Sequence, residues 1–448
     1  MPGGNRRLPL RVLVALGVSY ALVAAEPGSA DEAIPLTLAE ALARADRDSP
    51  ELAAARERAA AQGERAEGAA RSRWPRLAAA SDLWRSDNPA RVFAGKLNRG
   101  DFGAEDLALD NLNHPASLSH LTTALAVDLP LDVFGRLGLR TDAERATARS
   151  FEAAAEEARQ EARLRVVEAF ERAVLAQAAL RVGESALEGA RSREADFASR
   201  VEQGTALHAD WLRARARRRQ REAELAGSRE QRSVALALLA RAVGAPPGAL
   251  FAPQGSASLP GSEGTLEEWQ QRAAAGRGAT RAAHERRAAA EAALAGERRS
   301  RYPELGAYAR LEDDRGSSSS AGSYTVGGSL RWSLFDAGRG RRIAAAEAEA
   351  RAVGSEARAA ADQVRLEVEA AWRRLLGARE RHDAAQGGAE EGREALRVVQ
   401  ERRQAGMATL TDELETETVA RSAELEELAT AAEVVVAEAA LRRAAGSL

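Results

Sequence analysis

The sequence predicts a mainly α-helical protein with a small antiparallel β part, built from two copies of a helix–strand–strand–helix repeat. Three observations carry this prediction. Long segments dominated by Ala, Arg and Glu contain few aromatic residues, which make up 4% of the chain, as is typical of extended helices packed along their length. Two shorter segments change to a period of two, typical of strands. The two halves of the chain also match each other.

Residues 1–30 have the pattern of a secretory signal peptide. Arg6 and Arg7 precede the apolar run VLVALGVSYALVAA, and small-residue cleavage sites end at Ala25 and Ala30. An uncleaved N-terminal anchor is the alternative. No later segment approaches the roughly 18 apolar residues that a membrane helix requires. We therefore expect an exported chain that contacts a membrane only through strands or a surface helix.

The duplication defines the domain organisation. LTLAEALARA and GTLEEWQQRA both contain a T-x-x-E capping box, and RSRWPRL matches RSRYPEL at the same offset of 228 residues. Later matches, including Gly204 with Gly406, have an offset of 202 residues. We predict a first repeat over 31–245, a proline-containing surface linker over 246–263 and a second repeat over 264–448.

Each repeat is expected to begin with a helix that stops at a proline. Residues 36–73 and 265–301 keep small and apolar residues at helical spacing. The W-P and Y-P pairs at Pro75 and Pro303 end these helices, because the residue before a proline is disfavoured in the α conformation. The two prolines are therefore the predicted junctions between helix and strand.

β-Hairpins are predicted at about 74–133 and about 302–336. In the second hairpin, Tyr324, Val326 and Leu330 share one face and polar residues share the other. Strands of about ten residues with one apolar face match the wall of an outer-membrane barrel, and a soluble sheet with one buried face fits equally well. Four strands cannot close a barrel, so a membrane-spanning sheet would need eight strands from a dimer or twelve from a trimer.

After each hairpin, Gly135 and Gly338 mark a bend into a helix of about 60 residues, roughly 90 Å long, over 139–200 and 340–402. Each long helix runs to a glycine, Gly204 or Gly406, and restarts as a second helix of about 35 residues that folds back or continues. The first repeat alone carries an excursion, 85–120, rich in Asn, Asp, Gly and Pro. It is predicted to be a long loop outside the cell, with an inward fold that narrows the barrel as the alternative.

Composition argues against several classes of function. The net charge of −3 and the interleaved charges give no nucleic-acid surface. The five histidines lack the spacing of metal ligands, so neither a metal site nor another cofactor is expected. GRGRR lacks the G-K-[ST] of a nucleotide loop. An enzyme that uses helix-borne carboxylates would need a His or E-x-x-H constellation, which the sequence does not contain, and no enzymatic activity is expected.

The chain resembles the TolC-type family of bacterial outer-membrane efflux proteins in four segments, LTLAEALARADRDSPEL, SRWPRL, SLRWSLFDAGRGRR and RRQAGMATLTDELETE. The resemblance extends from residue 36 to about residue 445. It implies a homotrimer in which each chain supplies four strands to a twelve-stranded outer-membrane β-barrel, continued by a long α-helical barrel. It also implies outer-membrane lipid around the strands and most of the chain in the periplasm.

The same resemblance implies the exit duct of a tripartite efflux pump. The duct would passively conduct substrates delivered by a periplasmic membrane-fusion adaptor and an inner-membrane transporter of the RND or ABC type. A type I protein secretion channel is the alternative, and a soluble periplasmic coiled-coil scaffold or adaptor is a further one. An adaptor should show one helical hairpin flanked by lipoyl-like halves, whereas two hairpins alternate with strand pairs here.

In the family's pattern, acidic residues just after the helix-breaking glycine constrict the periplasmic mouth. Asp210, Asp412 and Glu415 occupy these positions, after the breaks at Gly204 and Gly406. In a trimer each acid would form a ring of negative charge that attracts cations.

Ordinary helix chemistry explains the same residues, and the two interpretations are compatible. Asp412 with Thr409 resembles a helix cap, and the glycines can terminate helices rather than act as hinges. Some family members lock the closed mouth with a Tyr before the glycine and an Arg after it. Because Arg403 and Ala408 stand at these positions here, that particular lock is not expected.

Overall fold

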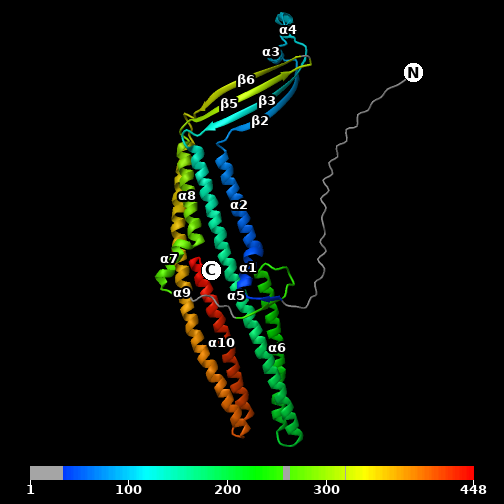
Figure 1. Ribbon diagram of the computed structural model, residues 1–448, viewed down its shortest axis with the longest axis vertical. Coiled ribbons are helices and arrows are strands. Elements are labelled where there is room, and N and C mark those ends of the chain that lie inside the picture. The colour runs from blue at the N-terminus through cyan, green and yellow to red at the C-terminus, as the bar shows by residue number, and fades with distance from the viewer. Residues whose placement is uncertain (1–33, 256–262, 318) are drawn as a thin grey trace, which may run out of the picture.

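The structure is a computed structural model that describes residues 34–255, 263–317 and 319–448. The predicted signal peptide, 1–30, lies outside the described residues. The chain is elongated, with a four-stranded sheet at one end of a set of long helices (Figure 1). The prediction of a mainly α protein with a small antiparallel sheet is confirmed. Within the described part of the chain, no helix has an apolar stretch long enough to cross a bilayer.

The sheet is antiparallel throughout, in the order β2-β3-β5-β6. Its strands are β2 (Arg76–Ser86), β3 (Leu118–Leu131), β5 (Glu304–Arg315) and β6 (Ser320–Arg331). Each hairpin of the sequence supplies two neighbouring strands, and β3 pairs with β5 to join the two repeats. β2 and β6 form the edges, and each is paired on one side only within the described chain.

The prediction of one continuous helix before each hairpin is wrong, because each is broken once. The first consists of α1 (Leu38–Asp48) and α2 (Pro50–Arg71), separated by Ser49 in an extended conformation. Pro50 causes this break, since it disfavours a helical residue before it, while the Ser49 hydroxyl caps α2. The second consists of α7 (Leu266–Gly276) and α8 (Gly278–Arg299).

The break between α7 and α8 has no proline and is held by a buried arginine. Arg277 is 1% exposed and adopts an extended conformation. Its guanidinium donates to Glu157 at 2.8 Å, to Glu367 at 2.8 Å and to the Ala444 carbonyl at 2.7 Å. These partners lie on three other helices, so the break is fixed by charge pairing that local sequence pattern does not reveal.

Two helical hairpins form most of the length of the molecule. In the first, α5 (Arg136–Glu202) is followed by α6 (His208–Ala242), and in the second α9 (Arg339–Gln404) is followed by α10 (Leu410–Ala445). The second helix of each pair folds back along the first, because α5 contacts α6 and α9 contacts α10. At 67 residues, α5 is about 100 Å long. It also contacts α2, α8 and α10 and so connects the two repeats.

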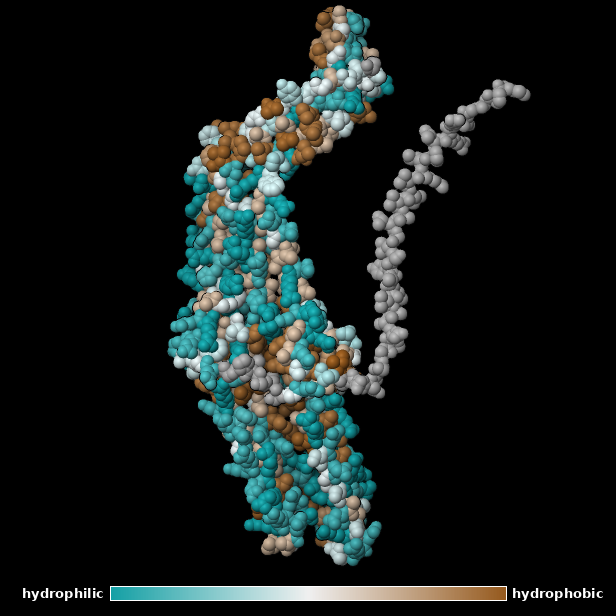
Figure 2. Space-filling view, viewed as in Figure 1, coloured by the Kyte–Doolittle hydropathy of each residue, from teal (hydrophilic) through white to brown (hydrophobic). Residues whose placement is uncertain are grey.

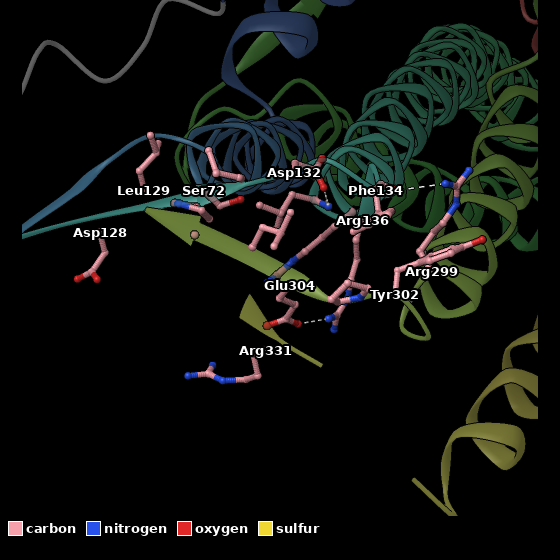
Figure 3. Close-up of a pocket in the computed structure, with 18 of the residues that line it drawn as sticks. Ser72, Asp128, Leu129, Asp132, Phe134, Arg136, Arg299, Tyr302, Glu304 and Arg331 are labelled. Atoms are coloured by element: carbon pink, nitrogen blue, oxygen red, sulfur yellow. Dashed lines mark hydrogen bonds and ion pairs between the residues drawn. The ribbon is translucent and has the colours of Figure 1, made fainter. Parts of the chain in front are cut away.

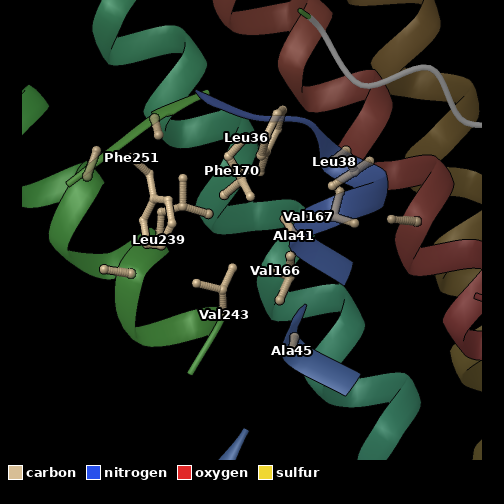
Figure 4. Close-up of a cluster of buried hydrophobic side chains, with 14 residues drawn as sticks. Leu36, Leu38, Ala41, Ala45, Val166, Val167, Phe170, Leu239, Val243 and Phe251 are labelled. Carbon is tan, nitrogen blue, oxygen red and sulfur yellow. The ribbon is translucent and has the colours of Figure 1, made fainter. Parts of the chain in front are cut away.

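A hydrophobic cluster half-way along the helices packs α1 and α6 against α5 (Figure 4). Val166, Val167 and Phe170 of α5 are fully buried there. Phe251 joins them from β4 (Phe251–Pro253), which pairs in parallel with β1 (Ile34–Leu36). The segment predicted as a surface linker, 246–263, therefore contains a strand with a core residue. A second cluster around Val368 and Leu375 supports α9 and α10.

The excursion, predicted as an irregular loop over 85–120, contains helices. They are α3 (Pro89–Asn98), the 3-10 turn η1 (Ala104–Leu107) and α4 (Leu109–Asn113). Asn88 caps α3 by accepting a hydrogen bond from the Arg91 N–H at 3.2 Å, and Pro89 occupies the first helical position. The residues that suggested a loop are thus the start signal of a helix.

Candidate functional site at the sheet and the hairpin tips

The strand register gives the sheet one apolar and one polar face. Leu125 lies opposite Leu311, which lies opposite Tyr324, and the same face holds most of the other large apolar side chains of the four strands. Trp84, Leu118 and Tyr308 lie on the other face. Because side chains alternate along a strand, the neighbouring residues face the other way. That second face, here called the polar face, carries Asp82, Thr122, Asp128, Arg310, Glu312, Ser323 and Thr325.

The apolar face is open in the single chain. Among its exposed large side chains the exposed fraction runs from 40% at Leu125 to 77% at Tyr324, and others such as Val127 and Leu129 are half-buried. Figure 2 shows hydrophobic side chains gathered over the sheet, whereas the visible surface of the long helices is mostly hydrophilic. A continuous exposed apolar face of this kind marks a surface that contacts lipid or another protein.

The predicted junction residues lie where the sheet meets the helices. Pro75 directly precedes β2, and Pro303 directly precedes β5. Gly135 begins α5 with a φ of 72°, a left-handed conformation that favours glycine, and Gly338 begins α9 with an ordinary φ of −81°. The two glycines thus occupy equivalent places with different backbone demands.

A cavity of about 1100 Å³ lies at this junction (Figure 3). Its wall combines aromatic and charged side chains from both repeats. Arg136 of α5 forms an ion pair with Glu304 of β5, and Arg299 of α8 donates to the Phe134 carbonyl at 3.1 Å. Phe134 stacks on Tyr302 with ring centroids 5.0 Å apart. These contacts hold the sheet at a fixed position on the helices.

The helix breaks at Gly204 and Gly406 lie at the opposite end of the molecule, at the tips of the two hairpins. Their φ values are 71° and 73°. At each tip the glycine N–H and the next N–H bond to carbonyls of the last helical turn, as in a Schellman motif. Nothing lies within 4 Å of a Cβ placed at either glycine. Backbone conformation alone therefore explains both glycines, and they terminate the helices.

The three acids predicted to line the aperture all lie near these tips. Asp412 accepts hydrogen bonds from the Thr409 N–H at 2.9 Å and hydroxyl at 2.7 Å, which completes the capping box of α10. These bonds hold the pKa of Asp412 below its ordinary value. Asp210 pairs with Arg213 at 3.3 Å, and Glu415 is exposed. The capping role predicted for Asp412 is therefore confirmed.

Two other acids beside the tips, Glu413 and Glu417, were missed by sequence reasoning. Both are buried, and they join the hairpins through a cluster here called the tip cluster: Arg193, Arg403, Glu413, Glu417 and Arg421. Arg193 of α5 contacts Glu417 at 2.7 Å and Glu413 at 3.6 Å. Arg403 of α9 pairs with Glu413.

The charges of the tip cluster decide the protonation of Glu417. Burial raises the pKa of its carboxyl, but the charges of Arg193 and Arg421 and their hydrogen bonds outweigh burial, so the pKa lies below its ordinary value. The carboxylate is therefore ionised at neutral pH and holds an α5 cation against α10. Only the packing of the two hairpins distinguishes Glu417 from the many exposed acids of the chain.

Comparison with known proteins identifies the family. The chain matches the outer membrane efflux protein family over residues 41–245 and 269–447. It belongs to this family. The two matched segments correspond to the two repeats, and the recognition of a TolC-like chain from its sequence motifs is confirmed. The family shows that the chain is an outer-membrane protein whose large helical part lies in the periplasm.

Solved structures of outer-membrane channels have the same fold. A membrane protein from Pseudomonas aeruginosa is 22% identical, with a TM-score of 0.74 over 91% of this chain and 93% of its own. VceC from Vibrio cholerae is 19% identical, with a TM-score of 0.74 over 92% and 96%. The CmeC channel of Campylobacter jejuni is 14% identical, with a TM-score of 0.77 over 92% and 85%. Comparison with curated protein sequences finds no match.

No group of three or more His, Cys, Asp or Glu side chains in the described ranges is arranged to hold a metal ion. Asp210, Glu413 and Glu417 of the tips are instead paired with arginines, and Asp412 caps a helix. The chain therefore has two candidate functional surfaces, the amphipathic sheet and the pair of charged hairpin tips.

Proposed function

We propose that this chain forms the outer-membrane exit duct of a tripartite efflux pump. Three copies contribute their sheets to a twelve-stranded barrel, and their helical hairpins continue the barrel as a tunnel through the periplasm. The observation that carries this proposal is the sheet, which has an apolar face, a polar face and two edges that are each paired on one side only.

The two edge strands need hydrogen-bonding partners from other copies of the chain. A row of unpaired N–H and C=O groups cannot lie in a bilayer, because lipid offers no hydrogen-bonding partner. Pairing β2 of one copy with β6 of the next repeats the same contact around a ring, which closes the edges. Four strands per chain and three chains give the twelve strands.

The two faces fix the direction of the sheet. The apolar face contacts lipid and the polar face lines an aqueous passage, as in other membrane barrels. Exposed aromatic side chains at the junction, Trp74, Trp332 and Phe335, lie where a membrane–water interface would be. With the helices in the periplasm, the far end of the sheet faces outside.

The hairpin tips are the proposed periplasmic mouth. Asp210, Asp412 and Glu415 of three copies would make rings that attract cations, and the tip cluster would hold the two hairpins of each copy together. A periplasmic adaptor would dock at these tips and connect the duct to an inner-membrane transporter of the RND or ABC type. The duct conducts passively and carries out no chemistry of its own.

Single-channel conductance in planar bilayers tests this function. We expect the purified mature protein to give long-lived cation-selective openings. Glu415→Gln should reduce the cation selectivity if the acid lies at the mouth. Glu424→Gln, on the same helix but further from the tip, is the matched control and should leave the selectivity unchanged. Absence of conductance from correctly folded protein would contradict the duct. Type I protein secretion remains the second candidate function, and export of a polypeptide by cells that depend on this chain would favour it.

A further inference from the structure

The excursion between β2 and β3 lies at the end of the sheet opposite all the long helices (Figure 1). β2 enters it at Ser86, and β3 leaves it at Leu118. On the proposed function, this end faces outside the cell. The contacts of the excursion show which face of the sheet it covers.

The helix α3 lies on the polar face. A Cβ placed at Gly95 of α3 would be 2.9 Å from the Leu118 Cδ2 and 3.1 Å from the Trp84 ring. Trp84 pairs with His120, and Leu118 is two residues from His120, so all three side chains share the polar face with Thr122. Val92 of α3 is 2% exposed. The apolar side chains at this end of the polar face are thus those that α3 covers.

Several contacts hold the helix there. Trp84 stacks on His120 with ring centroids 4.8 Å apart, and the Arg91 guanidinium lies over the Trp84 ring at 4.9 Å. His120 in turn contacts the Asp314 carboxylate of β5 at 2.7 Å, which also accepts from Thr122 at 2.6 Å.

The far end of α3 reaches across the sheet. The Arg99 side chain is 4% exposed, donates to the Ser119 carbonyl at 3.3 Å and pairs with Asp101 at 2.9 Å. A Cβ placed at Gly316, in the turn after β5, would overlap the Arg99 guanidinium. The excursion therefore spans from β2 to the β5–β6 turn, and it contacts both repeats.

We propose that α3 is a constriction inside the outer mouth of the duct. The inference rests on the proposed function, in which the polar face lines the passage. Three copies would place three helices within the mouth, and a helix with its side chains is roughly 10 Å wide. The interior of a twelve-stranded barrel is intermediate in width between that of an eight-stranded barrel, which side chains fill, and that of a sixteen-stranded barrel, which leaves an open channel. The three helices would therefore narrow the exit, and the packing of α3 would set the size of molecule that passes.

Access of a bulky reagent from outside tests the proposal. The sequence contains no cysteine, so one introduced cysteine is the only reactive thiol. Ala124→Cys places the thiol on the polar face of β3, two residues further from the excursion than Thr122. Leu125→Cys places it on the apolar face. Intact cells are treated with a polyethylene-glycol maleimide too large to cross the outer membrane, and labelling rates are compared.

Two variants displace α3 and one serves as the matched control. Val92→Asp buries a carboxylate against the sheet, and Gly95→Leu puts a side chain where no space exists, so either should release the helix. Ala94→Asp adds the same charge on the exposed side of α3. We expect Ala124→Cys to be labelled roughly tenfold faster or more with Val92→Asp or Gly95→Leu, and unchanged with Ala94→Asp. Gly95→Leu keeps the test valid if Val92→Asp fails to assemble.

The outcomes separate the constriction from the duct. Equal labelling of Ala124→Cys in all four backgrounds, with Leu125→Cys protected, would overturn the constriction and leave the duct intact. In the Val92→Asp or Gly95→Leu background, labelling of Leu125→Cys as fast as that of Ala124→Cys would show that the apolar face is not in lipid, and the proposed function itself would fail.

Discussion

Replacing Glu417 by Gln should separate the hairpin tips. The substitution keeps the shape of the side chain and removes the charge that Arg193 contacts at 2.7 Å and Arg421 at 2.9 Å. Breaking a buried ion pair costs about 3–5 kcal/mol. The two arginine side chains are 17% and 21% exposed, and Arg193 still has Glu413 at 3.6 Å. We therefore expect a cost smaller than that of a fully buried ion pair, and the substitution should lower the free energy of opening the tips by about 2 kcal/mol.

Hydrogen-exchange mass spectrometry measures this opening directly. A loss of about 2 kcal/mol should speed exchange about thirtyfold in the last turns of α5 and the first turns of α10, with the four strands of the sheet unaffected. Glu415→Gln removes the same charge two residues away at an exposed position and should leave exchange unchanged. Equal exchange in Glu417→Gln and Glu415→Gln would refute the tip cluster as the link between the hairpins.

Three further predictions concern the backbone, pH and the sheet. Gly406→Ala should cost about 1 kcal/mol because its φ is 73°, whereas Gly387→Ala within α9 should stabilise by up to about 1 kcal/mol, and a lower melting temperature for the second would contradict this. The pKa of Glu417 is depressed on folding, so the stabilisation it gives is present above the unfolded pKa of about 4.3 and is lost as the pH falls through the folded value. Protection of the tip amides, taken relative to the exchange rate of an unfolded chain at the same pH, should therefore fall in acid in wild type and not in Glu417→Gln. Val326→Arg on the apolar face should lower the free energy of folding in the membrane by about 2–4 kcal/mol, and Thr325→Arg on the polar face should lower it much less. The yield of protein folded into lipid bilayers measures this difference, and equal yields would contradict the two-faced sheet.

The repeated plan of the fold could be predicted from the sequence because its signals are local and strong. A change of period from 3.6 to two marks each hairpin, and the prolines at 75 and 303 mark where strands begin. The glycine of each tip needs a positive φ and shows as an isolated Gly between two helical patterns. These features depend on a few neighbouring residues.

Features that depend on distant contacts could not be predicted. The break at Arg277 exists because carboxylates of α5 and α9 and a carbonyl of α10 surround its guanidinium. Phe251, in a proline-containing linker, is buried because β1 pairs with β4. Glu417 differs from Glu415 only in the helix it faces. Charged residues at helical spacing look alike in sequence, and tertiary packing alone decides which are buried.

The number of chains in the assembled particle can be measured by native mass spectrometry after its release from outer membranes in mild detergent. Because one chain supplies four strands and leaves two edges of the sheet without hydrogen-bonding partners, we expect particles of three chains. A folded monomer or a dimer as the largest species would contradict it, since neither gives the twelve-stranded closure on which the duct and its outer constriction depend.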